Sequence, residues 1–92
     1  MRQAILIRVK PEDYEVWLRE HTAAREARET YGITDGPFYR DAGDPQAVLV
    51  HLDVEDLQRS MEWFRSDRFK AGVRRAGTVQ REFWIAEKRA PA

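Results

Sequence analysis

The sequence contains no cysteine, which excludes disulfide bonds, cysteine nucleophiles and zinc sites built on thiolate ligands. It also has no apolar run long enough to form a signal peptide or a membrane-spanning helix. Both absences are typical of a protein that works in a reducing compartment, away from membranes. We therefore expect a cytoplasmic protein with no membrane partner.

An excess of charge of one sign is also missing. Lysine and arginine together number 16, as do aspartate and glutamate, so the formal net charge is zero. No block of like charge is long enough to attract the phosphate backbone of nucleic acid. Nucleic acid is therefore not an expected partner. Arginine carries most of the positive charge, which is typical of a GC-rich bacterial genome.

Several catalytic motifs are absent as well. The sequence has no glycine-rich phosphate-binding loop, and Ser60 and Ser66 lack the glycine-flanked turn of a serine nucleophile. The two histidines, His21 and His51, show no His-Glu-x-x-His pattern or similar metal-ligand spacing. We expect neither a bound metal ion nor nucleophilic serine chemistry.

The sequence does contain an ordered series of strand patterns. Residues 3–9, 38–41, 47–53 and 78–86 are short and rich in β-branched or aromatic side chains, so we expect strands there. Residues 42–46, Ala-Gly-Asp-Pro-Gln, form an expected turn that joins the second and third strands as an antiparallel hairpin.

Two helical segments separate these strands. The first is expected to begin at Pro11 and to end beside Gly32, which can adopt the left-handed conformation that stops a helix. The second is expected to be capped by Asp53, to be capped again at Ser66 and to end at Gly77.

The length of the chain allows one hydrophobic core but not two. The order of patterns is β-α-β-β-α-β. We therefore expect residues 1–92 to form a single α+β domain, ferredoxin-like, with a four-stranded antiparallel sheet.

Apolar side chains occupy both faces of this expected sheet. In residues 3–9 and 47–53 they stand at odd and even positions alike. Two helices can cover only one face, so the other would be a large exposed apolar patch. A symmetric homodimer is the simplest way to bury it. The alternative is a monomer in which the tail or the helices wrap over this face.

Polar residues interrupt the apolar stripe of the first helix. At about 100° per residue, the stripe contains Trp17 and Leu18, and His21, Arg25 and Arg28 lie within it. A charge on the core side of a helix is costly unless it meets a partner, water or a ligand, so a cavity beneath the helix would account for all three. Alternatively, the arginine stems cover apolar surface and the histidine bonds to a backbone carbonyl.

Further candidates for substrate binding are aromatic. Trp17, Tyr39, Trp63 and Phe64 could line a pocket and orient a flat, oxygenated ligand, although most aromatic residues simply form the core. His51 is a further candidate, and the sequence leaves open whether it points into the interior or into the dimer face.

Three stretches carry a family resemblance. They are residues 20–25 (Glu-His-Thr-Ala-Ala-Arg) with Gly32 after them, the hairpin of residues 39–48, and the ending Arg-Arg-Ala-Gly of residues 74–77. In this order and spacing, the sequence resembles small bacterial proteins of the dimeric α/β barrel superfamily, which includes antibiotic biosynthesis monooxygenases, polyketide cyclases and many uncharacterised members. The resemblance covers nearly the whole chain.

The resemblance implies a homodimer with a cavity between sheet and helices in each subunit. Similar proteins include oxygenases that act on quinol-like substrates without flavin or metal, cyclases, isomerases and haem degraders. The haem-degrading pattern has an asparagine on the first strand, where this chain has Ile5, Leu6, Ile7 and Val9, so haem is not expected.

Two hypotheses for the function follow. The first is an enzyme without a cofactor, a cyclase or monooxygenase that acts on an aromatic or polyketide-like small molecule. His21 would remove a proton, and Arg25, four residues later on the same helix face, would stabilise the enolate. The second is a non-catalytic dimer that binds a metabolite or supports a larger complex.

Overall fold

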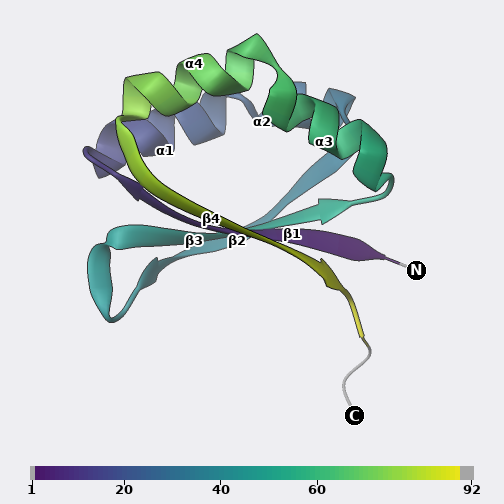
Figure 1. Ribbon diagram of the computed structural model, residues 1–92, viewed down its shortest axis with the longest axis horizontal. Coiled ribbons are helices and arrows are strands. Elements are labelled where there is room, and N and C mark those ends of the chain that lie inside the picture. The colour runs from purple at the N-terminus through teal and green to yellow at the C-terminus, as the bar shows by residue number, and fades with distance from the viewer. Residues whose placement is uncertain (1, 90–92) are drawn as a thin grey trace.

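The computed structural model describes residues 2–89, and four strands in this range form one antiparallel sheet with the order β2-β3-β1-β4. The strands are β1 (Gln3–Pro11), β2 (Ile33–Asp41), β3 (Asp44–Val54) and β4 (Thr78–Glu87). The helices are α1 (Tyr14–Ala23), α2 (Arg25–Thr30), α3 (Leu57–Arg65) and α4 (Asp67–Ala76). The helices lie over one face of the sheet, and the other face is open (Figure 1). The expected ferredoxin-like α+β fold is confirmed.

The first helix begins later than the sequence predicts. Pro11 is the last residue of β1, where it lies opposite Thr78 of β4. The cap of α1 is Asp13, whose carboxylate accepts the backbone N–H groups of Glu15 at 2.9 Å and Val16 at 3.2 Å. This side chain satisfies the exposed N–H groups of the first turn, so the helix starts after it and not at the proline.

The single helix expected before Gly32 is divided at Ala24 into α1 and α2. Ala24 has φ −89° and ψ 1°, outside the helical region, and no side chain caps α2. A stripe drawn at constant helical spacing does not continue through such a break. Gly32, with φ 75°, follows α2 in the left-handed conformation that the sequence predicts.

The second helical segment is divided where expected. The Ser66 hydroxyl accepts a backbone N–H from the first turn of α4, and Gly77, with φ 63°, ends that helix. The predicted cap at Asp53 is wrong. Asp53 lies within β3, and Asp56 supplies the carboxylate that caps α3.

The second strand is longer than expected, because β2 begins at Ile33 and not at Phe38. Its pairing with β3 shifts register between Asp35 and Phe38. Gly36 lies within this irregularity, and a Cβ atom there would stand 2.9 Å from the carbonyl oxygen of His51. Glycine and proline at positions 36–37 resemble a turn in the sequence, which is why the strand was not expected there.

The hairpin turn is shorter than the expected residues 42–46. Strand β2 ends at Asp41 and β3 starts at Asp44, so Ala42 and Gly43 alone connect them. The Asp41 carboxylate accepts the Gly43 N–H at 2.8 Å and stabilises this turn from within the strand.

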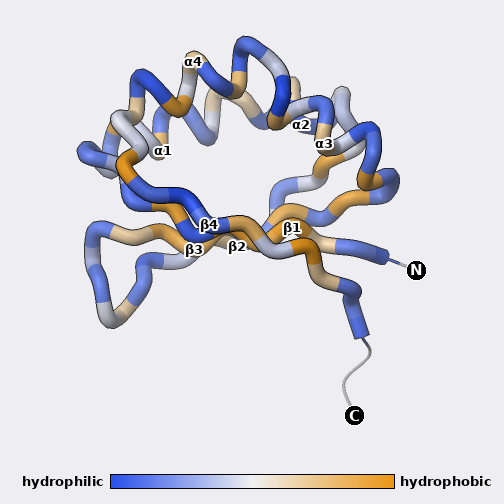
Figure 2. Tube along the Cα trace, viewed as in Figure 1, coloured by the Kyte–Doolittle hydropathy of each residue, from blue (hydrophilic) through white to orange (hydrophobic). Residues whose placement is uncertain are grey.

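The hydrophobic core lies between the helices and the covered face of the sheet. It includes Ile5 and Ile7 of β1 and Val48, Val50 and Leu52 of β3, which alternate along their strands. Figure 2 shows hydrophobic residues gathered in the centre of the sheet, whereas the helices alternate between hydrophobic and hydrophilic positions. Such an alternation leaves a polar surface outside and apolar contacts inside.

The open face of the sheet is partly apolar. Leu6 and Leu49 are each 37% exposed there, Tyr39 is 59% exposed and Trp84 is 49% exposed. Leu6 lies opposite Trp84 in the register of β1 and β4. No element within residues 2–89 covers this face, so the alternative of a wrapped monomer is not observed in the described chain.

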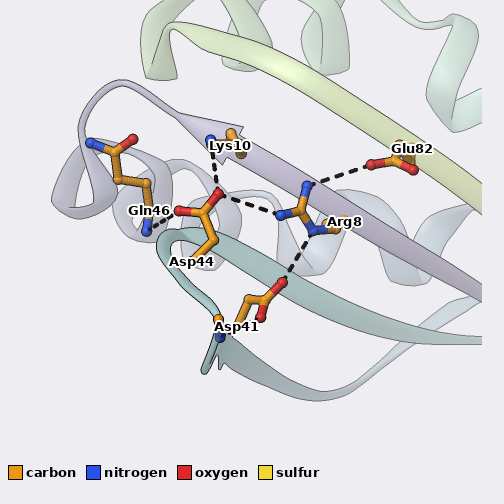
Figure 3. Close-up of polar contacts among 7 residues, drawn as sticks. Arg8, Lys10, Asp41, Asp44, Gln46 and Glu82 are labelled. Atoms are coloured by element: carbon orange, nitrogen blue, oxygen red, sulfur yellow. Dashed lines mark hydrogen bonds and ion pairs between the residues drawn. The ribbon is translucent and has the colours of Figure 1, made fainter.

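Charged residues of the open face form a closed network at one end of the sheet (Figure 3). The Arg8 guanidinium contacts Asp41 at 3.2 Å, Asp44 at 3.4 Å and Glu82 at 3.5 Å. Lys10 contacts Asp44 at 2.8 Å, and this hydrogen bond lowers the pKa of Asp44. Each of these charges therefore has a partner within the chain.

Candidate active site

A cavity of about 200 Å³ lies between the helices and the covered face of the sheet. Strands β1 and β3 supply an apolar floor that includes Ile7, Val50 and Leu52. Its aromatic lining residues are Trp17, Trp63, Phe64 and Phe69. This volume is somewhat below the range of about 300–1,000 Å³ typical of ligand pockets, so it suits a small molecule.

His21 lies in the last turn of α1 and lines this cavity. Its ring stacks on Trp17 with 4.8 Å between centres and meets the edge of Phe38 at 5.5 Å. Its side chain is 12% exposed. Burial, reinforced by the positive charge of Arg28 and opposed by Asp35, lowers the pKa of His21 from 6.5 to about 4. The imidazole is therefore neutral at pH 7.

The ring nitrogens of His21 have no hydrogen-bond partner within residues 2–89. The nearest charged atom is the Asp35 carboxylate, at 4.0 Å from Nε2, which is too far for a hydrogen bond. A polar group in such an apolar setting normally has a partner. The arrangement leaves the imidazole available to a molecule bound in the cavity.

Arg28 of α2 is the charged residue beside His21. It is 4% exposed, and its Nε and Nη2 atoms each lie 2.7 Å from an oxygen of Asp35. Nη2 also donates to the His21 carbonyl oxygen at 2.5 Å. Nη1 makes no hydrogen bond with the described residues and can donate to a ligand, since Arg28 lines the cavity. The two-point contact with Asp35 fixes the plane of the guanidinium.

The expectation that Arg25 shares the cavity with His21 is wrong. Its side chain is 68% exposed and pairs with Glu29 at 3.4 Å. The break at Ala24 turns Arg25 outward and brings Arg28 inward, although a continuous helix would place Arg25 below His21. The partner Asp35 falls within the unexpected first part of β2, so the buried ion pair of Arg28 could not be predicted from the sequence.

Two other expected binding residues lie on the opposite face of the sheet. Tyr39 and His51 belong to the open face, with Tyr39 paired to Leu49 in the register and His51 paired to Leu6. The His51 Nε2 lies 2.9 Å from Asp53. Neither residue lines the cavity, so the expected place of Tyr39 in the pocket is wrong, and His51 lies on the open face, one of the two orientations that the sequence left open. Trp17, Trp63 and Phe64 do line it.

Four charged residues at the cavity were not singled out from the sequence. They are Glu20, Arg68, Arg75 and Arg81. Arg75 pairs with Glu20 through Nε and Nη2, and this contact lowers the pKa of Glu20 and raises that of Arg75. Arg68 and Arg75 are seven residues apart on α4, a spacing that returns to the same helix face and could have signalled a shared role.

The part of the chain between residues 2 and 89 holds no group of three His, Asp or Glu side chains placed to bind a metal ion. Within the same range, no helix is long and apolar enough to cross a membrane. The chemistry that the described residues offer at the cavity is acid–base catalysis by a neutral imidazole beside a fixed guanidinium.

Comparison with known proteins shows the same fold in solved structures. No protein-family model matches the sequence, and no curated protein matches it. A protein from Bordetella bronchiseptica, provisionally named an antibiotic biosynthesis monooxygenase, has a TM-score of 0.78 and 12% identity over 97% of this chain and 98% of that chain. A protein from Nitrosomonas europaea with the same provisional name has a TM-score of 0.74 and 8% identity over 98% and 92% of the two chains. These likenesses show that the chain shares the fold of both structures.

Proposed function

We propose that this protein is an enzyme of the dimeric α/β barrel kind that removes a proton from a small aromatic or polyketide-like molecule without a cofactor. The observation that carries this proposal is the neutral His21 imidazole, which faces an apolar cavity with both ring nitrogens unpaired in the described chain. The provisional names of the two structural neighbours support the oxygenase form of the reaction.

In the proposed reaction, His21 accepts a proton from a phenol or an activated carbon of the substrate. The electron pair stays on the substrate as a phenolate or enolate, and the proton forms an imidazolium. The Asp35 carboxylate, 4.0 Å from Nε2, stabilises that imidazolium. Arg28 takes the role first assigned to Arg25, because its positive charge and free Nη1 group stand beside the site where the substrate gains negative charge.

Two reactions share this first step. In a cyclase, the enolate attacks a carbonyl group of the same molecule. In a monooxygenase, the enolate reacts with dioxygen as the co-reactant. The geometry supports the proton transfer common to both, and turnover assays distinguish them.

Anthrone, a tricyclic carbon acid, is a suitable probe for this proton transfer. Exchange of its acidic hydrogen with D₂O can be followed by NMR, and oxygen uptake reports the oxygenase reaction. We expect the protein to accelerate exchange above the rate in buffer and His21→Gln to reduce this acceleration by about a hundredfold. His51→Gln, on the opposite face, is the matched control and should retain it.

Full acceleration in His21→Gln would contradict the proposed base. Binding of anthrone without any accelerated exchange would favour the alternative of a non-catalytic binding protein. A bound substrate anion would raise the low pKa of His21, because a nearby negative charge favours the charged form of an imidazole.

We also propose that a second copy of this chain covers the open face of the sheet. Leu6, Leu49, Tyr39 and Trp84 give this face an exposed apolar centre. The charges at its edge are already paired within the chain, so burying them leaves no unpaired charge in that network. A self-complementary face of this type suits a symmetric homodimer.

A further inference from the structure

The charges around the cavity fall into paired and unpaired groups. Arg28 is paired with Asp35 at 2.7 Å, and Arg75 is paired with Glu20. Within each pair the positive and the negative charge neutralise each other. The remaining two charged lining residues are both arginines, Arg68 and Arg81, and both are exposed where they line the cavity, which places them at its opening.

Arg81 is held in place by aromatic rings. It lies opposite Val9 in the register of β1 and β4, and Val9 is a buried core residue, so Arg81 stands on the covered side of the sheet. Its guanidinium carbon is 5.0 Å from the centre of the Phe69 ring and 5.4 Å from that of Phe83. These cation–π contacts position the group, and it makes no hydrogen bond or ion pair with residues 2–89.

Arg68 adds a second positive charge without a carboxylate partner in the described chain. Its Nη2 atom donates to the carbonyl oxygen of Ala23 at 3.1 Å, at the end of α1. The last carbonyl groups of a helix carry partial negative charge, so this contact orients the guanidinium but does not neutralise it. Among the described residues, Glu20 is the one carboxylate that lines the cavity, and it is already paired with Arg75.

This combination of features favours one class of ligand. An apolar interior with aromatic walls accepts a flat hydrocarbon body, neutral or charged. Two guanidinium groups without carboxylate partners at the opening add a preference for an anion at one end of that body. The planar fork of an arginine matches the two oxygens of a carboxylate.

We propose that the natural ligand is a flat apolar molecule with a carboxylate group, which Arg81 binds at the opening of the cavity with support from the charge of Arg68. The rings of the ligand extend inward toward His21. This inference rests on the proposed function, because it assigns the substrate class of the same cavity. It makes Arg81 a specificity-determining residue and not a base.

Titration calorimetry with two matched compounds tests the inference. The compounds are 2-naphthoate and 2-naphthamide, which share their rings and nearly their size but differ in charge. We expect the protein to bind 2-naphthoate about tenfold more tightly than 2-naphthamide, since a charge-assisted contact at an exposed opening has roughly this effect. Raising the salt concentration should reduce the difference.

Two arginine variants locate the anion site. Arg81→Gln should lose most of the preference for 2-naphthoate while its affinity for 2-naphthamide stays unchanged. Arg74→Gln removes an exposed arginine of the same region that does not line the cavity, so it should keep the preference. A preference that persists in Arg81→Gln would overturn the assignment.

The outcomes separate this inference from the proposed function. Equal binding of both compounds to the unaltered protein would overturn the carboxylate preference and leave the cavity as a ligand site. Binding of neither compound at millimolar concentration would contradict both proposals. Binding of both that survives Gly72→Leu, which fills the cavity from α4, would place the ligand elsewhere and would also overturn both.

Discussion

The two histidines lie on opposite sides of the sheet and differ in their polar partners. His51, on the open face, lies 2.9 Å from Asp53, and Asp53 also contacts Lys88 at 2.7 Å. His21, on the covered face, is more buried and yet has no hydrogen-bond partner in the described chain. Two of the arginines differ in the same way, although Arg28 and Arg75 on the covered side do have carboxylate partners. Arg8 contacts three carboxylates, whereas Arg81 contacts none within residues 2–89.

This difference indicates which side of the sheet is suited to contact with another protein and which is suited to a ligand. Polar groups that already have partners cost less to cover with another protein than unpaired ones, because they keep those partners. Polar groups without partners are costly beside an apolar cavity unless a bound ligand supplies the missing hydrogen bonds. The contrast supports the two proposals made above, self-association through the open face and a small-molecule ligand on the covered side.

The largest effect on stability is expected from Arg28→Met. Removing the guanidinium leaves the Asp35 carboxylate, which is 18% exposed, without its partner, and such a loss costs about 3–5 kcal/mol. Arg25→Met is the matched control, because its exposed ion pair with Glu29 contributes less than about 1 kcal/mol. Urea denaturation at one protein concentration measures both. Similar losses of stability in the two variants would contradict the expectation that the buried ion pair contributes more than the exposed one.

The next effect is a loss of stability in acid that depends on His21. Its pKa is about 4 in the folded chain and 6.5 when unperturbed, so the unfolded state binds a proton first as the pH falls. The contribution of His21 to the free energy of unfolding is fully present above pH 6.5 and declines by about 3 kcal/mol as the pH falls to 4. Arg28 and Asp35 are the charged groups that face it.

Denaturation curves of the protein and of His21→Gln across this pH window measure the contribution of His21 to the free energy of unfolding. The variant should lose much less stability between pH 6.5 and 4. Carboxylates whose pKa is lowered by their partners, such as Asp53 and Asp44, act at lower pH and affect both proteins equally. Parallel curves would show that His21 is not a buried neutral imidazole.

A charge in the centre of the open face should have the third largest effect. Leu49→Glu places a carboxylate where the proposed homodimer buries apolar surface, and we expect the dissociation constant to rise by about thirtyfold. Sedimentation equilibrium measures the change, and Arg25→Glu serves as a surface control on the helix side. A protein that is monomeric at all accessible concentrations before mutation would contradict the dimer.

The smallest effect is expected from adding a methyl group on each side of the sheet. In Gly36→Ala the new atom would meet the His51 carbonyl oxygen at 2.9 Å, so we expect a loss of about 1–2 kcal/mol. In Gly72→Ala the nearest atom would be at 4.0 Å and the glycine lies within α4, so we expect a gain of about 0.5–1 kcal/mol. Thermal unfolding of both variants tests this opposite pair, and a shift of the same sign in both would contradict it.

The sequence predicts those parts of the fold that depend on local chemistry. Ser66 and Gly77 are recognised because a hydroxyl cap and a left-handed glycine act within one helical turn. The alternation in β1 and β3 is likewise local, and it correctly indicates a sheet with two apolar faces. His21 is placed correctly in the cavity because it precedes the helix break.

The parts that the sequence could not predict depend on contacts between distant segments. Nothing marks Ala24 as a break, since alanine favours a helix, and the break decides between Arg25 and Arg28. The face of Tyr39 depends on the register of β2, which shifts beside Gly36, and the face of His51 depends on which side of β3 the helices cover. Arg68 and Arg75 of α4 meet Arg81 of β4 at the cavity only when these two elements are assembled together.

The position of β1 in the sheet has a consequence for the order of folding. This strand precedes the other described elements in the chain, and yet it lies in the interior of the sheet, paired with β3 on one side and β4 on the other. Its partner on the β4 side reaches from Thr78 to Glu87, so the last described strand must be available before β1 is enclosed. Until then the ribosome-bound chain presents β1 as an apolar edge strand. We expect the folding rate to be set by this most distant pairing.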